Sequence, residues 1–523
     1  MKRIFCVLLV LTLCAAVIPG CTGGDNGSDA NTLTIMTKSW EDVAPSKKDQ
    51  FLWKEYERRT GIKINWVEVP VIAMEERKST TMVSGTLPDI FFQYDSFTNE
   101  EIALYGSQGY FIPLDDKLDK LPNLVKMMGE MPVVKPSITM TDGHIYSFPY
   151  VIDSTSGLTC RYYVHKEYLK GSGLASLESL NDLETYMKYV KTLSIDGKQP
   201  YGMWQSPHTE WFLEMQLMGS YGLNQNGYQQ YLQRVYDPGN GKLLFTPTDL
   251  KFKELWQRMA KWISEGWWNK EILTAGVEYP EWVIAGTEGL VGSFTWSGAQ
   301  FLHSTAPEEY VAFSALEGPY SRNLSWVDTP VRGLAGAMIT KDCKNVDAAL
   351  SWLDYFYGEE GFLFAKTGIE GVTYEIVDGK YRYTDIINSY KGGQQLGAFQ
   401  QGLFSYGAGL PFYEPKKYSD IGDQLNNTTF EASIGCTEES ILKYYPKEVW
   451  PAFLGTPEEI DELAAITNDI ITYIDESRMK FLSGQWNFGN DWDAYVNQLN
   501  KLKVSRYLEI KQAQYDRYKS NAK

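Results

Sequence analysis

The stretch formed by residues 83–95 constrains the fold of this chain more strongly than any other. It reads Val-Ser-Gly-Thr-Leu-Pro-Asp-Ile-Phe-Phe-Gln-Tyr-Asp. Gly85 can adopt the left-handed conformation that closes a helix, and Pro88 prevents that helix from continuing. Residues 90–92 form an apolar run without polar alternation, which is typical of a strand covered on both faces in a parallel sheet. The sequence therefore predicts a helix end, a tight turn and a buried strand.

Alternating strand and helix patterns lead up to this stretch. Residues 33–36 and 62–69 are expected to be strands, whereas residues 47–60 and 72–84 are expected to be helices. Two consecutive crossovers of this kind form a right-handed α/β lobe around a parallel sheet.

Aromatic and acidic side chains follow two of these strands directly. Trp40 lies just beyond the first strand, and Tyr94 and Asp95 lie just beyond the strand at 90–92. In an open parallel sheet, ligands bind in the crevice outside the carboxyl ends of the strands. The sequence therefore predicts ligand contacts at Trp40, Tyr94 and Asp95. The alternative is that the two aromatic rings belong only to the core.

Several motifs together resemble a known family. Residues 84–90, Ser-Gly-Thr-Leu-Pro-Asp-Ile, resemble the (A/S)SG-x-LPDI signature of family 1 extracellular solute-binding proteins, of the lipoprotein type that serves carbohydrate ABC importers. Further matches lie at residues 142–162, 343–356 and 368–379. The resemblance implies an α/β fold of the class II periplasmic-binding-protein type. Each of its two lobes would be a mostly parallel sheet flanked by helices, with extra helices at the C-terminus.

The resemblance also implies where the chain crosses between the lobes. The first crossing resembles residues 142–162, and the return crossing resembles residues 330–339. The implied division has four parts after the leader. They are residues 32–150 as the first part of lobe 1, 151–330 as the first part of lobe 2, 331–385 as the second part of lobe 1, and 386–523 as the second part of lobe 2 with a helical C-terminus.

Further ligand contacts follow from the same resemblance. Tyr150, Asp153 and Arg332 would lie at the hinge, facing the cleft. Trp296 ends an apolar run and resembles the aromatic residue that binding proteins of the maltose-binding type place against a sugar ring. Tyr374 belongs to a Gly-x-Glu-Gly-x-x-Tyr loop that resembles one of the lipoprotein subgroup.

The N-terminus has the pattern of an export signal. Residues 1–20 combine a basic start with a short apolar run, and a polar tract follows them. Residues 18–21 resemble a lipobox, which implies that Cys21 carries lipid, although Pro19 departs from the usual residue there. Residues 21–31 would then be a flexible tether and the protein a membrane-anchored lipoprotein facing away from the cytoplasm. The alternative is a plain secretory signal with an incidental cysteine.

Charge and cysteine content exclude other partners. Loss of the leader takes the formal net charge from −17 to −19, which argues against nucleic acid or an anionic membrane surface as the partner. The cysteines beyond the anchor are Cys160, Cys343 and Cys436, far apart and odd in number, so neither disulfides nor a zinc site is expected. Residues 194–198 offer only one carboxylate for calcium. We expect no metal and no cofactor.

Two classes of function remain to be weighed. A binding protein would capture a carbohydrate, an oligosaccharide in particular, between the lobes and deliver it as a monomer to the permease subunits of an ABC transporter. A surface glycoside hydrolase would need two carboxylates roughly 5 to 9.5 Å apart, which a sequence cannot exclude. No nucleophile elbow, phosphate loop or dinucleotide fingerprint is present, so the sequence favours a binding protein over an enzyme. A pure adhesin would need no cleft.

Overall fold

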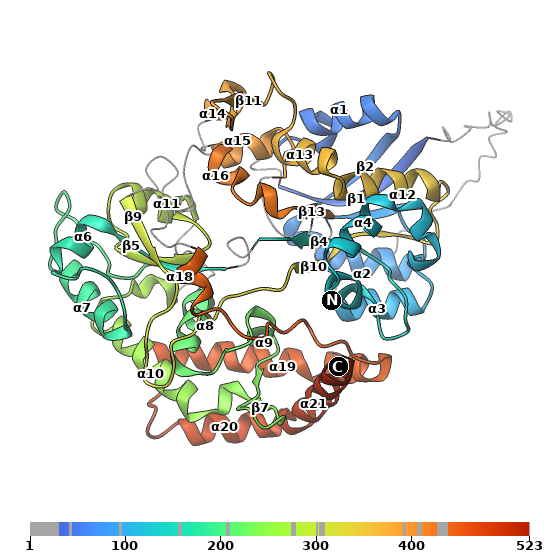
Figure 1. Ribbon diagram of the computed structural model, residues 1–523. Helices are drawn as coiled ribbons and strands as arrows, with labels where there is room; N and C mark the ends of the chain where they lie inside the picture. The colour runs from blue at the N-terminus through green and yellow to red at the C-terminus, as the bar shows by residue number, and fades with distance from the viewer. Residues whose placement is uncertain are drawn as a thin grey trace, which may run out of the picture.

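The structure is a computed structural model of two lobes joined by extended segments (Figure 1). It describes residues 31–40, 44–93, 97–154, 159–205, 210–273, 279–299, 302, 309–390, 394–404, 410–425 and 438–521. Each lobe has its own buried apolar core. The expected two-lobed α/β fold is confirmed.

Lobe 1 is built on a six-stranded mixed sheet. Its strands, in spatial order, are β13 (Phe412–Glu414), β4 (Phe148–Ile152), β10 (Val331–Ile339), β3 (Ile90–Phe92), β1 (Thr32–Ser39) and β2 (Lys63–Pro70). β1 pairs in parallel with β2 and β3, and β13 pairs in parallel with β4. β10 runs antiparallel to both of its neighbours. All three residues of β3 are buried, as the unbroken apolar run predicts.

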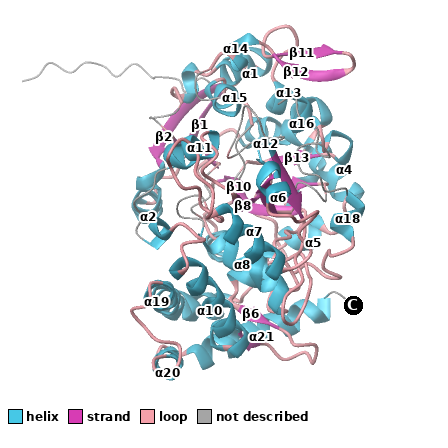
Figure 2. Cartoon of the chain, turned by 90° about the vertical axis from the view of Figure 1, so that its left-hand side faces the viewer, coloured by secondary structure: helices cyan, strands magenta, loops and turns pink. Residues whose placement is uncertain are grey.

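Helices cover both faces of this sheet. They are α1 (Phe51–Thr60), α2 (Met74–Ser84), α3 (Asn99–Ser107), α4 (Pro122–Glu130), α5 (Val134–Ile138), α12 (Val346–Asp354), α13 (Glu359–Thr367), α14 (Asp385–Asn388), α15 (Gln394–Gln400) and α16 (Ile421–Leu425). Gly85 ends α2 with a φ of 71°, which confirms the predicted left-handed stop. A hairpin of β11 (Tyr374–Val377) and β12 (Lys380–Tyr383) projects at the far end of the lobe (Figure 2).

Lobe 2 is mainly helical around a small sheet. The sheet has the order β8 (Ser293–Trp296), β5 (Arg161–His165) and β9 (Tyr310–Phe313), and a two-stranded ribbon consists of β6 (Val235–Tyr236) and β7 (Leu244–Phe245). The helices are α6 (Lys166–Gly171), α7 (Leu180–Val190), α8 (Glu210–Tyr221), α9 (Tyr228–Leu232), α10 (Leu250–Ser264), α11 (Tyr279–Thr287), α18 (Glu438–Leu442), α19 (Pro457–Leu482), α20 (Trp492–Lys501) and α21 (Val504–Asn521). Thr456 caps α19 in the predicted capping box.

Two details differ from the expectations. The described strands of the lobe 2 sheet pair antiparallel, whereas the resemblance implied a mostly parallel sheet. The described residues between Ile387 and Leu425 add side chains to the lobe 1 core and supply β13, whereas the sequence analysis placed residues 386–523 in lobe 2. β13 has only three residues, and its partner β4 is distant in sequence, so no local pattern reveals the pairing.

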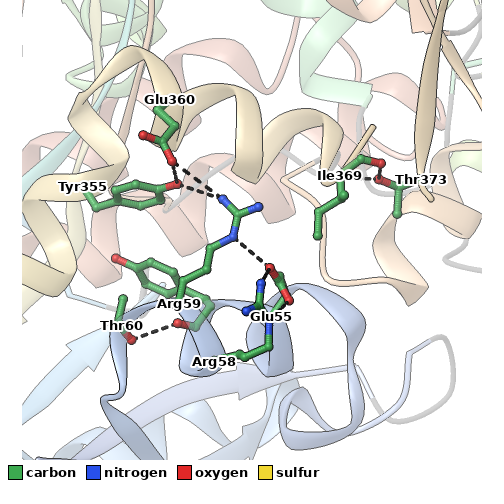
Figure 3. A network of polar contacts seen from close by, with 9 residues as sticks. Glu55, Arg58, Arg59, Thr60, Tyr355, Glu360, Ile369 and Thr373 are labelled. Atoms are coloured by element: carbon green, nitrogen blue, oxygen red, sulfur yellow. Dashed lines mark hydrogen bonds and ion pairs between the residues drawn. The ribbon is translucent and has the colours of Figure 1, made fainter. Parts of the chain in front are cut away.

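A surface network fastens the two halves of lobe 1 together (Figure 3). Arg59 on α1 pairs with Glu55 at 2.9 Å and lies 3.7 Å from Glu360 on α13. The Arg59 guanidinium also donates to the hydroxyl of Tyr355 at 3.4 Å. Hydrogen bonds from Arg58 and Arg59 lower the pKa of Glu55 to about 2. The part of lobe 1 that follows the return crossing is thereby joined to the first helix of the lobe.

Candidate functional site

The lobe 1 side of the candidate site begins where β1 ends. Trp40 is half-buried, and its ring meets Phe399 of α15 edge-on at a centroid distance of 5.0 Å. The ammonium of Lys38 lies 4.7 Å from the centroid of the same ring. The rim therefore combines an accessible indole with a cation, a pairing that suits contacts with polar rings.

Buried polar groups lie behind this ring. Lys47 is 6% exposed, and its ammonium is 3.5 Å from the amide oxygen of Gln93, which directly follows β3. Burial lowers the pKa of Lys47 to about 8, with Glu68 opposing this effect and Lys38 adding to it. The buried hydroxyl of Ser39 has no hydrogen-bond partner within the described residues. This corner of lobe 1 can offer both donors and acceptors to a polar ligand.

The lobe 2 side is a continuous series of aromatic rings, here called the aromatic ledge. Trp296 at the end of β8 lies 6.0 Å from Trp282 of α11 and 5.0 Å from Phe212 of α8, between ring centroids. Phe212 lies 4.1 Å from Trp326, and Trp326 stacks on Tyr228 of α9 at 6.2 Å. The members of the ledge are Trp211, Phe212, Tyr228, Trp282, Trp296 and Trp326. Trp211, Phe212, Tyr228 and Trp296 are half-buried, so each exposes part of its ring.

The hinge residues lie between these two rims. Tyr150 of β4 is 8% exposed and stacks on Phe412 at 4.8 Å, and burial raises the pKa of its hydroxyl. The backbone of Asp153 donates to Glu414 at 2.9 Å, so the crossing chain is held against β13. Arg332 of β10 pairs with buried Asp328 through Nε and Oδ2 at 3.0 Å. Burial raises the pKa of Asp328 to about 6, although Arg332 opposes this shift.

A large cavity lies behind the connecting strands. It has a volume of about 620 Å³ and is lined by α3 of lobe 1, by β10, and by α9, α19 and α21 of lobe 2. In Figure 1, these lobe 2 helices lie below β10, whereas α11 and α15 lie above it. We call the side of α11 and α15 the cleft side and the cavity the rear cavity. Arg332 lines the rear cavity.

The structure brings only some of the sequence candidates together. Trp40 and Trp296 lie on opposite lobes, and Tyr150, Asp153 and Arg332 lie at the hinge between them. Tyr374 instead packs on Tyr381 within the β11–β12 hairpin, at the end of lobe 1 (Figure 2). Tyr94, Asp95 and Cys21 lie outside the described residues, as does Cys436.

The ledge residues other than Trp296 were missed by the sequence analysis. Trp211 and Phe212 open α8, where two adjacent aromatic residues at a helix start are compatible with ordinary core packing. Trp326 precedes the return crossing by only a few residues, which is the one local signal that could have identified it.

Cys160 and Cys343 are buried and unbridged, and burial raises the pKa of both thiols.

The described residues hold neither a metal cluster nor a membrane-spanning helix. No group of three or more His, Cys, Asp or Glu side chains in this part of the chain could hold a metal ion. Of the helices described, none combines the length and apolar character needed to cross a bilayer.

Two α/β lobes that are joined at a hinge by extended strands, with aromatic rings on each lobe, are typical of solute-capturing proteins. The chain belongs to the bacterial extracellular solute-binding protein family, whose model matches residues 52–381. The expected family is thus confirmed, and the chain is a non-enzymatic transport component.

Relatives of known name extend over nearly the whole chain. The fructooligosaccharide ABC transporter substrate-binding protein FusA of Streptococcus pneumoniae serotype 4 is 24% identical over 521 residues, covering 94% of this chain and 91% of that protein. Lipoprotein LipO of Bacillus subtilis is 25% identical over 529 residues, covering 94% and 97%. Among solved structures, alginate-binding protein AlgQ2 without calcium ion superimposes with a TM-score of 0.74 at 22% identity, covering 93% of this chain and 98% of that one.

Proposed function

We propose that this protein is the oligosaccharide-binding component of an ABC importer. The observation that carries the proposal is the aromatic ledge of lobe 2, together with the indole of Trp40 on lobe 1. Aromatic faces suit the C–H surface of a pyranose or furanose ring, and they bury a large area at a small entropic cost. Relatives named for fructooligosaccharide and alginate binding support the same class of ligand.

The polar contacts of this site would come from the hinge and from lobe 1. We place Tyr94, Asp95, Tyr150 and Asp153 with Trp40 and Trp296 in the contact set. We leave out Arg332, which lines the rear cavity, and Tyr374, which packs on Tyr381 in the β11–β12 hairpin. The carboxylates in this set would accept hydrogen bonds from sugar hydroxyls, so that selectivity would depend on where each hydroxyl lies.

The experiment is a titration of the purified protein with two oligosaccharide series, neutral fructans and uronate-containing oligomers. Ligand at ~100 times its dissociation constant adds about 2.7 kcal/mol to folding stability, so a thermal-shift screen identifies the series before calorimetry. We expect one series to bind with a chain-length optimum, because several rings line the ledge. Absence of binding by both series, with amino acids or peptides binding instead, would contradict the proposal.

We further propose attachment to the outer face of the cytoplasmic membrane through lipidated Cys21, next to the permease subunits that receive the solute. The leader pattern supports this anchor, as does similarity to a relative named a lipoprotein. In a native host, Cys21→Ala is expected to move the protein from the membrane fraction to the medium or periplasm. Retention of the variant in the membrane fraction would show that the anchor assignment is wrong.

A further inference from the structure

One helix crosses the boundary between the two lobes. Ile460, in the first turn of α19, is 6% exposed and belongs to the core of lobe 1. Leu463, Ile466 and Ile470 of the same helix belong to the core of lobe 2. Because a helix is a rigid element, the lobes cannot rotate freely about a flexible strand at this point.

The segment at residues 454–460, here called the rear contact, packs against lobe 1 and so joins the two lobes. The hydroxyl of Thr141 donates to the carbonyl of Gly455 at 3.3 Å. Ala103 and Ser107 of α3 line a small cavity together with Ile460 and the α19 cap, so α19 approaches α3 closely here. Glu100 of α3 also counteracts the lowering of the Lys511 pKa that burial causes on α21. Apolar and charged interactions thus both join the lobes at this place.

The rear contact lies on the side of the hinge away from the proposed sugar site. α3, α9 and α19 surround the rear cavity below β10, whereas α11 and α15 carry the neighbours of Trp296 and Trp40 above it (Figure 1). When two rigid lobes turn about strands between them, narrowing one side widens the other. Packed contacts on the widening side do not stretch and therefore separate.

We propose that the rear contact opposes closure of the cleft, so that solute capture requires Ile460 to leave the lobe 1 core. This inference rests on the proposed function, because it assumes that a bound solute draws the lobes together. The apparent affinity of such a protein is reduced by the free energy needed to reach the binding-competent conformation. Weakening the rear contact therefore tightens solute binding without changing a single solute contact.

The test compares three variants of the full protein by calorimetry with the best oligosaccharide found above. Ile460→Ala is expected to lower the dissociation constant roughly tenfold, and Ile460→Val, which removes one methyl group, about twofold. Ile470→Ala is the matched control, since Ile470 lies in the same helix at 2% exposure but belongs to the lobe 2 core. Its dissociation constant should equal that of the wild type even though its melting temperature falls.

A second readout needs no ligand. Small-angle scattering of empty Ile460→Ala is expected to give a smaller radius of gyration than empty Ile470→Ala. Equal affinity of wild type and both Ile460 variants, or weaker binding by them, would overturn the proposal. If the wild type binds no oligosaccharide, the proposed function fails, and equal radii for the two alanine variants would then overturn the rear contact separately.

Discussion

The two lobes face each other with different chemistry. Lobe 2 contributes six aromatic rings in contact, whereas lobe 1 contributes one accessible indole with buried lysine and amide groups beside it. An aromatic side chain can stack on many kinds of sugar ring, whereas a hydrogen bond depends on where each sugar hydroxyl lies. We therefore expect lobe 2 to supply most of the affinity for the sugar and lobe 1 to supply most of the selectivity among sugars.

The two lobes also differ in the polar networks that stabilise them. Lobe 1 uses the exposed network around Glu55 and Arg59 (Figure 3), whereas lobe 2 buries a carboxylate, Glu214, beneath the ledge. Glu214 accepts hydrogen bonds from Trp256 at 2.7 Å and from Tyr231 at 3.0 Å. The ring of Tyr231 stacks on Trp211 at 6.0 Å. The buried network therefore supports the ledge from below.

The largest expected effect concerns this buried carboxylate. Glu214 lies 3.8 Å from both Arg234 and Arg478, and removing one member of a buried ionic group leaves the others poorly compensated. Glu214→Gln is expected to lower the free energy of unfolding by about 3 kcal/mol, measured by urea denaturation.

The control is Glu184→Gln in the same lobe. Glu184 also binds a tryptophan, Trp262, at 2.8 Å, but its side chain is 15% exposed and can be solvated. We expect a loss of about 1 kcal/mol or less for this variant. Equal losses for the two variants would remove the distinction between buried and exposed networks.

The second effect tests the affinity contributed by lobe 2. Trp296→Ala removes a central ring of the ledge and is expected to cost about 2 kcal/mol of binding free energy, or roughly thirtyfold in dissociation constant. Trp486→Ala is the control, because Trp486 is also half-buried in lobe 2 but packs on Phe481 away from the ledge. If Trp296 is only a core residue, both variants will melt earlier and bind the oligosaccharide normally.

The third effect tests the single indole of lobe 1. Trp40→Ala is expected to raise the dissociation constant about tenfold, less than Trp296→Ala, because one ring rather than a series is interrupted. Trp66→Ala serves as the control, since Trp66 is half-buried in the same lobe but packs on Trp53. A larger loss at Trp40 than at Trp296 would reverse the proposed division between the lobes.

The sequence predicted the parts of this molecule that local rules control. The helix stop at Gly85, the buried strand at Ile90–Phe92 and the cap at Thr456 each depend on neighbouring residues and are confirmed. The pairing of β13 with β4 was not predicted, because it joins segments far apart in the chain.

The same limit applies to the candidate site. Trp40 and Trp296 follow strand patterns, so their places at the strand ends could be predicted. Phe212 and Trp326 join the ledge only through tertiary packing. No neighbouring residue distinguishes Phe212 from a core aromatic, and the only local signal for Trp326 is its position shortly before the return crossing.

The smallest expected effect concerns the buried lysine of lobe 1. Burial lowers the pKa of Lys47 to about 8 from 10.5, so between these values the unfolded chain holds more protons than the folded protein. Stability therefore rises with pH through this window, by about 1 kcal/mol between pH 7 and pH 9. Lys47→Met is expected to abolish that rise, as measured by urea unfolding at the two pH values. Lys48→Met, at an exposed neighbouring position, should keep it. The same slope in wild type and Lys47→Met would mean that Lys47 is solvated in the folded protein, and lobe 1 would then lack the buried donor that its part in selectivity requires.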